Sequence, residues 1–370
     1  MVMLDFWVPL FASLIVSAVL VLTKSKHLKF TGAEDDTSAV QASHTVPTPR
    51  IGGVAIMAGM VVGALVSLLQ GNSLYLVLLL TGVPMFLTGL GEDLFRHVST
   101  KIRYLSTVVS AAIAVWATGI WITTADSYGL EWAFALPPLA ILITLFVVAS
   151  YCHAFNLIDG LNGLASGTGI LIAVGLAGIA VQAEQQEIVA MCMITAVSIA
   201  GFFIFNFPFG RIFLGDGGAY IIGYMLTWIG LVILHLEPAT STWALFLVFF
   251  WPLADTLFAI YRRVSRGVSL DTADRLHFHQ VVLRGLEIFF LGRNKRSTAN
   301  PLATSVLLPV IAVPVFTGVY LWDNPLASFL ALVFFGFAFV LSYRIGIRAA
   351  QVRLRRPSTR QDNSTVQPAE

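Results

Sequence analysis

Long apolar stretches alternate with short polar gaps along almost the whole chain. A helix needs about 20 apolar residues to cross the hydrocarbon core of a bilayer, and eleven stretches come close to that length. The pattern therefore predicts an all-α integral membrane protein with about 11 transmembrane helices. They are expected at Phe6–Leu22, Gly52–Leu69, Leu74–Leu90, Leu105–Thr123, Leu136–Ser150, Leu164–Val181, Ile188–Phe205, Ala219–Leu234, Trp243–Ile260, Ala303–Leu321 and Pro325–Tyr343.

The polar gaps differ in charge, because all 22 Lys and Arg residues lie in every second gap. The gap at Cys152–Asn162 belongs to the same side by alternation, although it holds no basic residue. Positive charge on short loops stays in the cytoplasm during insertion. We therefore predict an outside N-terminus, a cytoplasmic C-terminus and an active site on the cytoplasmic face. The basic gaps are Lys24–Arg50, Arg96–Arg103, Arg211, Arg262–Arg296 and Arg344–Arg360.

The remaining gaps are too short to fold into a separate domain, so residues 1–356 are predicted to form one polytopic domain. Residues 357–370 are polar and are expected to be a disordered cytoplasmic tail. Val281–Leu291 is apolar but too short to span. It favours a helix lying on the inner leaflet, with a loop packed on the bundle as the alternative.

Composition supports a membrane protein, since 57% of the residues are hydrophobic and only 11% are charged. A net charge of +2 gives no case for nucleic-acid binding. The basic residues of the tail are expected to anchor the topology and to contact anionic membrane lipids. Cys152 and Cys192 are expected near opposite ends of their helices, which excludes a disulfide between them.

Polar residues collect in five clusters, all on the basic side. The first follows Arg50, where Gly52 and Gly53 open a helix. Their N–H groups could approach an anion, although close helix packing is the better explanation of paired glycines taken alone. In the second, Glu92 and Asp93 repel each other unless a divalent cation or a nearby base such as Lys101 or Arg103 neutralises them.

The third cluster is the strongest, because Asn156, Asp159 and Asn162 recur every three residues among glycines. On a helical turn this spacing places all three side chains on one side. A simple turn between two helices needs far fewer polar residues, and such residues are costly at membrane depth. The cluster therefore indicates a binding site.

The fourth cluster runs from Asn206 through Phe213 to Asp216, at the start of another helix. Asp216 could bind a hard cation while neighbouring N–H groups bind phosphate, or it could simply cap the helix. The fifth contains His277 and His279, too few ligands for zinc, which favours contact with phosphate. Asp255, inside the preceding helix, needs a partner, either an internal Arg or His or a ligand.

Carboxylates, glycine-rich turns and basic side chains together are typical of a diphosphate site. Mg²⁺ usually takes one or two protein carboxylates and completes its shell with phosphate oxygens and water. A site at the inner membrane surface suggests one nucleotide substrate and one lipid substrate. A lipid phosphate has a second pKa of about 6, so an Asp or Glu suffices as proton acceptor.

These motifs, in this order between Pro49 and Gln280, resemble the polyprenyl-phosphate N-acetylhexosamine-1-phosphate transferases of glycosyltransferase family 4. The resemblance is to the undecaprenyl-phosphate GlcNAc-1-phosphate transferase branch, which has eleven helices. The matching segments are PRIGG at Pro49, GED at Gly91, KIR at Lys101, AFNLIDGLNGLASG at Ala154, FNFP at Phe205, IFLGDGG at Ile212, PLADTLFAIYRR at Pro252 and DRLHFHQ at Asp274.

The resemblance implies transfer of a sugar-1-phosphate from a UDP-N-acetylhexosamine to undecaprenyl phosphate, with release of UMP. It also implies Mg²⁺ as cofactor, with Mn²⁺ as a substitute, and a bacterial inner membrane where the reaction initiates O-antigen or a related surface glycan. The sugar, direct displacement against a covalent intermediate, and a homodimer all stay open.

The resemblance also assigns residues. It implies that Asp216 binds the metal and that the acidic pair Glu92 and Asp93 handles the metal, with Asp93 as ligand, or the lipid phosphate. The catalytic residues would then be Glu92, Asp93, Asp159 and Asp216. It implies that the substrates contact Arg50, Lys101, Arg103, Asn156, Asn162, Asn206, Phe213, His277 and His279.

Three positions depart from the commonest family pattern. Glu92 stands where Asp is usual, and Asn162 replaces an Asp associated with the uridine. An amide can still donate to and accept from a uracil edge. Gln280 replaces a histidine, which removes a potential positive charge.

A membrane transporter with intramembrane carboxylates is the alternative function. Transporters place such groups near the midplane on broken helices. Here all the acidic candidates except Asp255 are expected at inner helix ends, which favours the transferase.

Overall fold

The computed structural model describes residues 4–31, 48–126, 129, 131–268, 276–292 and 295–355, and these residues contain helices but no strand. The predicted tail at 357–370 and Asp274 lie outside the described residues. The helices are α1 Leu4–Leu22, α2 Lys24–Thr31, α4 Gly52–Leu69, α5 Leu74–Thr81, α6 Val83–Phe95, α7 Thr100–Thr118, α8 Glu131–Ala135, α9 Pro137–Ile158, α10 Leu164–Gln182, α11 Gln186–Asn206, α12 Gly215–Leu236, α13 Thr242–Val248, α14 Phe250–Val264, α15 Phe278–Leu286, the π-helix η1 Glu287–Leu291, α16 Arg296–Tyr320 and α17 Pro325–Arg355.

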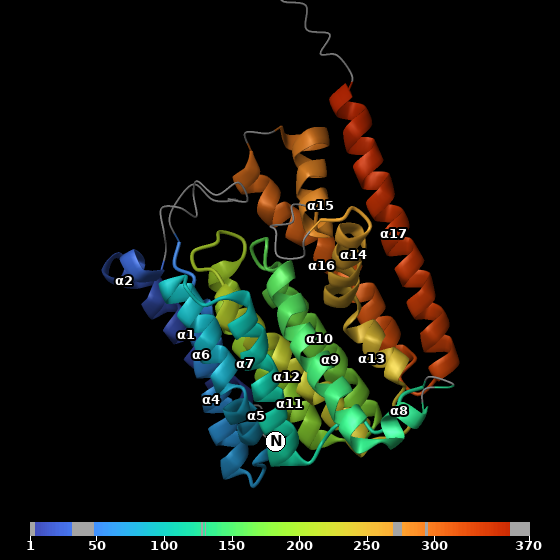
Figure 1. Cartoon of the computed structure of the whole chain (residues 1–370). Coiled ribbons are helices and arrows are strands. Elements are labelled where there is room, and N and C mark those ends of the chain that lie inside the picture. The colour runs from blue at the N-terminus through green and yellow to red at the C-terminus, as the bar shows by residue number, and fades with distance from the viewer. Residues whose placement is uncertain are drawn as a thin grey trace, which may run out of the picture.

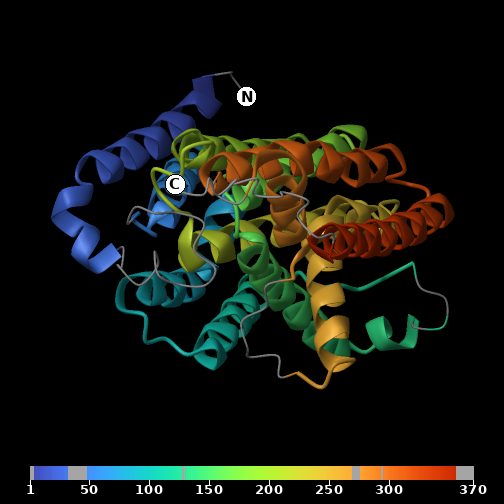
Figure 2. The same ribbon diagram turned by 90° about the horizontal axis from the view of Figure 1, so that it is seen from above.

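Helix α12 forms the centre of the bundle and is buried without interruption from Gly215 to Ile233. It contacts α4, α6, α9, α10 and α11, and its Tyr220, Tyr224 and Trp228 are among the largest fully buried side chains. Helices α1 and α17 lie at the periphery and expose most of their apolar side chains (Figures 1 and 2). The buried centre therefore fixes the start of α12 in place.

Two of the predicted spans are broken. The third is divided at Gly82 into α5 and α6, which are inclined by 45°, and the ninth is divided at Phe249 into α13 and α14, which are inclined by 84°. Each break lies just before a proline, Pro84 or Pro252, which lacks an N–H group and is tolerated in the first turn of a new helix. Each of these two predicted segments therefore consists of two helices joined at a bend.

Within the described residues, eight helices are long and apolar enough to cross a membrane, and the count rises to ten if each bent pair forms one span. The remaining predicted segment corresponds to α7, which begins earlier, at Thr100, and carries Lys101 and Arg103 in its first turn. The chain is therefore a multi-pass helical membrane protein, while the count of eleven stays a prediction. Helix α1 begins at one end of the bundle and α17 finishes at the other (Figure 1).

Two further differences affect the polar clusters. Helix α9 continues to Ile158, so Asn156 lies in its last turn and not in a loop. The segment expected on the inner leaflet forms α15 and η1, and α15 packs against α16 and α17. Its Leu283 is buried whereas Phe290 is exposed, so the segment covers the bundle with one face and presents apolar side chains on the other.

Candidate active site

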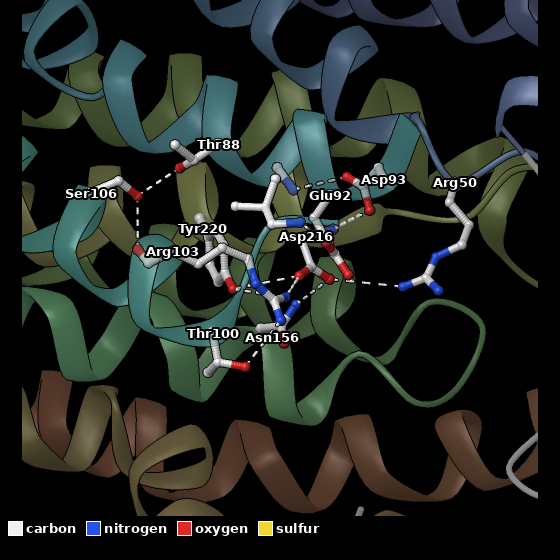
Figure 3. A network of polar contacts seen from close by, with 12 residues as sticks. Arg50, Thr88, Glu92, Asp93, Thr100, Arg103, Ser106, Asn156, Asp216 and Tyr220 are labelled. Atoms are coloured by element: carbon white, nitrogen blue, oxygen red, sulfur yellow. Dashed lines mark hydrogen bonds and ion pairs between the residues drawn. The ribbon is translucent and has the colours of Figure 1, made fainter. Parts of the chain in front are cut away.

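Asp216 stands in the first turn of α12, and its carboxylate is contacted by side chains from three other segments of the chain (Figure 3). Its Oδ2 accepts a hydrogen bond from Nη1 of Arg103 in α7, and its Oδ1 accepts one from Nδ2 of Asn156 in α9 at 2.8 Å. Arg50, just before α4, lies 3.8 Å from Oδ1 through its Nη2. One carboxylate thus joins residues that are more than one hundred positions apart in the chain.

The hydroxyl group of Tyr220 extends this network, since it lies 3.5 Å from both Oδ2 of Asp216 and Nη1 of Arg103. Tyr220 follows Asp216 by one helical turn and therefore points in the same direction. The ring of His153 lies between Tyr220 and Tyr104, with ring centroids 4.9 and 5.4 Å away. These aromatic rings form one wall beside Arg103.

Asp93 has a different role from Asp216. Its Oδ1 accepts the backbone N–H of Asp216 at 2.8 Å and its Oδ2 accepts that of Gly217 at 3.0 Å. The side chain of Leu214 gives α12 no cap of its own. Asp93, at the end of α6, therefore caps α12 from a distant part of the chain and is buried there.

The glycine pairs bring the helices together and do not leave N–H groups free for an anion. The N–H groups of Gly52 and Gly53 donate to the carbonyl oxygens of Phe213 and Leu214, both at 2.9 Å. A Cβ on Gly53 would lie 2.4 Å from the backbone nitrogen of Gly218. The anion-binding interpretation of these glycines is wrong, and close packing explains them.

A cavity of about 220 Å³ opens beside Asp216. Glu92 lies on its wall and accepts the N–H of Val98 at 2.9 Å, which orients its carboxylate. The cavity thus brings three acidic side chains face to face with three guanidinium groups. It is lined by Arg50, Glu92, Asp93, Arg96, Arg103 and Asp216.

The three polar residues of the strongest motif do not share one side. Asn156 meets Asp216, whereas Nδ2 of Asn162 donates to the carbonyl oxygen of Pro208 at 2.9 Å. Asn162 is 4% exposed, and its backbone N–H and C=O groups are held by Asn300 and Thr304. The predicted common face is wrong because α9 ends at Ile158, so the helical repeat does not continue to Asn162.

Asp159 directly follows the last residue of α9 and lies between Asn156 and Asn162 in the sequence. Burial raises the pKa of its carboxyl group to about 7, the nearby Asp216 carboxylate adds to the rise, and Arg50 opposes it. The carboxyl group of Asp159 is therefore able to gain or lose a proton near neutral pH.

Asn206 and Phe213 shape the approach to α12 from outside the cavity. The side chain of Asn206 accepts the N–H of Gly163 at 2.6 Å and donates to the carbonyl oxygen of Ile212 at 2.8 Å. The N–H of Phe213 donates to the carbonyl oxygen of Pro49 at 2.8 Å. In this structure both residues connect the segments that carry the site.

His277 and His279 lie apart from the cavity and are buried against Asp255 of α14. Lys101 is exposed at the start of α7 and does not line the cavity. Of the residues predicted from sequence, the structure therefore gathers Arg50, Glu92, Asp93, Arg103, Asn156 and Asp216 around one point, with Asp159 nearby.

Two residues at the site were missed by the sequence analysis. Arg96 directly follows α6 in a left-handed conformation with φ of 57° and lines the cavity, a placement that no simple sequence pattern reveals. Tyr220 carried a usable signal, because it follows Asp216 by four residues in a predicted helix.

Comparison with known proteins adds an independent observation. Residues 75–234 match the sequence profile of glycosyl transferase family 4, a range that contains Glu92, Asp93, Arg103, Asn156 and Asp216.

Three bacterial relatives carry the name undecaprenyl-phosphate alpha-N-acetylglucosaminyl 1-phosphate transferase. The Yersinia pestis protein is 26% identical over 329 residues, which is 85% of this chain and 87% of the relative. The Salmonella typhi protein is 28% identical over 87% of this chain and 88% of its own length. The Escherichia coli (strain K12) protein is 27% identical over 64% of this chain and 65% of its own length.

Proposed function

We propose that this chain, whose residues 75–234 match the profile of glycosyl transferase family 4, transfers an N-acetylhexosamine-1-phosphate from a UDP-sugar to undecaprenyl phosphate, releasing UMP. The product is a lipid-linked diphosphate sugar that initiates a surface glycan such as O-antigen. We place the reaction at the cytoplasmic face of a bacterial inner membrane. N-acetylglucosamine is the first sugar to test, because the relatives are named for it.

The observation that carries this proposal is the paired charge of the cavity beside Asp216. Three guanidinium groups, from Arg50, Arg96 and Arg103, line a cavity of about 220 Å³. The same cavity is lined by the carboxyl groups of Glu92, Asp93 and Asp216. Two phosphate-bearing substrates repel each other strongly, and phosphoryl transfer asks a protein mainly to position them and to neutralise their charge. Guanidinium groups suit this task because they bind phosphate oxygens in a bidentate manner.

Mg²⁺ is the cofactor that we propose, with Mn²⁺ as a substitute. Asp216 supplies a carboxylate on the cavity wall, and Mg²⁺ takes one or two protein carboxylates together with phosphate oxygens and water. The described residues hold no cluster of three His, Cys, Asp or Glu side chains arranged for a metal. This donor set fits an ion whose shell the substrates complete, and that ion would neutralise diphosphate charge.

The other residues of the site would then hold Asp216 in position and contact the substrates. Asn156 and Arg103 hold the Asp216 carboxylate from opposite sides, so its direction is fixed before substrates arrive. Asp93 holds the backbone of the same residue and acts on its position. We retain Glu92 as a cavity-wall residue available to the lipid phosphate or to the metal.

The reaction does not need a strong general base at this site. An undecaprenyl monophosphate is largely ionised at pH 7, because its second pKa is about 6. Asp159, whose carboxyl pKa is raised to about 7, can accept the remaining proton at neutral pH. Asp159 is thus the proton acceptor that we propose.

The test incubates membranes that contain the protein with undecaprenyl phosphate, Mg²⁺ and a panel of UDP-amino sugars. We expect a lipid diphosphate sugar from at least one donor. Absence of product from every donor, with folded protein present, would remove the proposal. The transporter alternative has no support, because the relatives described above are transferases and the acidic residues gather at helix ends.

A further inference from the structure

The roles assigned above leave one buried carboxylate unexplained. Asp255 lies in α14, is 1% exposed and does not line the cavity beside Asp216. A carboxylate removed from water is costly unless its oxygens are paired. What Asp255 binds therefore indicates why it is present.

Both oxygens of Asp255 face the segment that carries the two histidines. Oδ1 accepts the backbone N–H of Phe278 at 3.0 Å, and Oδ2 lies 3.1 Å from Nδ1 of His277. The same Oδ2 lies 3.8 Å from Nδ1 of His279. A carboxylate on Nδ1 fixes the direction of an imidazole ring and turns its Nε2 towards another partner.

That other side of His279 faces the turn between α9 and α10. A Cβ built on Gly160 would lie 2.2 Å from Nε2 of His279, so the ring can approach the turn this closely only because residue 160 is glycine. Gly160 directly follows Asp159 and lies four residues after Asn156, which bonds to Asp216. The rings of His277 and His279 are stacked with centroids 5.6 Å apart, so the position of one ring restricts that of the other.

The backbone before the two rings has a separate anchor. The hydroxyl group of Tyr343, in α17, donates to the carbonyl oxygen of Leu276 at 3.0 Å. Nη1 of Arg262 donates to that same hydroxyl group at 3.3 Å. Loss of the Asp255 charge should therefore release the rings without releasing the whole segment.

We propose that Asp255 is a positioning residue: it orients His277 and His279 so that His279 holds the Asp159–Gly160 turn in place beside the Asp216 site. The inference rests on the proposed function, because this turn carries Asp159, the proposed proton acceptor, and joins Asn156 to Asn162, which the resemblance assigns to substrate contact. Asp255 touches no substrate and acts through the two imidazole rings.

Steady-state kinetics of Asp255→Asn test the proposal. The variant keeps the size of the side chain and loses the charge. We expect the KM for the UDP-sugar to rise roughly 10- to 100-fold, as for loss of one hydrogen bond to a charged group, while kcat changes by less than about threefold. The matched control is Asp126→Asn, because Asp126 accepts the N–H of Thr242 at 2.7 Å in a similar bond, remote from the cavity. The control should keep the wild-type KM.

A double-mutant cycle separates positioning from general stability. In a His277→Gln/His279→Gln background, Asp255→Asn should add almost no further loss, since its effect passes through the rings. A loss of the same size in both backgrounds would overturn the proposal. So would a wild-type KM in the Asp255→Asn single variant.

A second measurement needs no turnover, and so keeps failure of this inference distinct from failure of the proposed function. Spectra of the ¹⁵N-histidine-labelled, unliganded protein report the imidazole environments directly. Gly160→Ala should shift the resonances of His279, because the new Cβ displaces its ring. Asp255→Asn, where it accumulates, should shift those of both His277 and His279. Unchanged His279 resonances in Gly160→Ala would overturn the proposal whatever the wild-type turnover.

Discussion

At the scale of single residues, Asp216 and Asp93 show how two neighbouring carboxylates acquire different roles. Asp216 turns both oxygens towards side-chain donors, Arg103 and Asn156, on the wall of the cavity. Asp93 turns both oxygens towards backbone N–H groups at the start of α12. The first is suited to exchange partners with a metal or a phosphate, whereas the second is suited to hold a helix end.

This difference predicts that substitutions of Asp93 and Asp216 will have different effects on stability and on metal binding. Asp93→Ala should lower the melting temperature, because loss of a helix cap costs about 1–2 kcal/mol, and should slow turnover through misplacement of Asp216. Asp216→Asn should abolish Mn²⁺ binding while the melting temperature stays near that of the wild type. Thermal unfolding and Mn²⁺ titration of the purified variants provide the check. If Asp93→Ala lost Mn²⁺ as completely as Asp216→Asn with no change in melting temperature, Asp93 would be a metal ligand and not a cap.

The pKa of Asp159 predicts a pH dependence. Since that pKa is raised from 3.8 to about 7, the carboxylate form dominates only above neutral pH. The value of kcat/KM should therefore fall as the pH drops through 7, by about tenfold per unit at the lower end. In Asp159→Asn this inflection should disappear, and only the titration of the lipid phosphate near pH 6 should remain. Identical profiles for the two proteins from pH 5.5 to 8.5 would exclude Asp159 as the proton acceptor.

Sequence reasoning found most residues of the cavity because phosphate chemistry uses few residue types. Arg103, Asn156 and Asp216 stood out as polar residues at the ends of apolar helices. It could not assign Asp93 to a cap, because the helix that Asp93 caps begins more than one hundred residues later. Asn162 was wrongly placed on the same face as Asn156, because the sequence does not show that the helix ends between them.

At the scale of elements, the site depends on how closely α4, α6 and α12 approach one another. A Cβ on Gly89 of α6 would lie 2.7 Å from backbone atoms of Gly217, and one on Gly53 of α4 would lie 2.4 Å from those of Gly218. Small residues at such crossings let helix backbones approach closely inside a membrane. The approach places Asp93 within hydrogen-bonding distance of the start of α12.

Substitution of these glycines tests that dependence. Gly53→Ala should destabilise the fold by about 1–3 kcal/mol, the usual cost of overpacking, because its new Cβ meets backbone that cannot turn aside. Activity should fall with it, since α4 carries Arg50 at its entrance. Gly336→Ala in α17 is the matched control, because no atom lies within 4 Å of its Cβ position. Equal melting temperatures and rates for the two variants would contradict the packing argument.

Helix positions were predictable from apolar length, whereas helix breaks were not. Gly52–Leu69 was predicted with the bounds that α4 has, because both ends are marked by polar residues. The 84° bend before α14 left no gap in the apolar run from Trp243 to Ile260, and only Pro252 hinted at it. Asp255 was expected about two turns inside the ninth helix, and it lies in α14, where that helix meets the histidine segment.

At the scale of the whole molecule, the polar contacts collect at one end of the bundle. Helices α4, α7 and α12 begin there, while α6, α9 and α14 end there. The basic gaps of the sequence fall at the same end, which is the reason to expect that it faces the cytoplasm. Such a site would meet a soluble nucleotide and a membrane lipid at one surface.

Cysteine labelling tests the predicted orientation. The two native cysteines, Cys152 and Cys192, are buried and should not react. A membrane-impermeant maleimide added to intact cells should label Gln186→Cys, at the end of the bundle remote from the cavity, and should leave His97→Cys unlabelled. Inside-out vesicles should give the reverse pattern. Labelling of His97→Cys in intact cells would place the cavity on the outer face and contradict the predicted topology.

The central claim is that a sugar-1-phosphate, and not a sugar alone, is transferred to the lipid. The most direct test is the identity of the nucleotide that purified protein releases from a UDP-N-acetylhexosamine in the presence of undecaprenyl phosphate and Mg²⁺. We expect UMP, formed in equal amount with a lipid diphosphate sugar and absent with Asp216→Asn. Release of UDP, with a lipid monophosphate sugar as product, would contradict the claim.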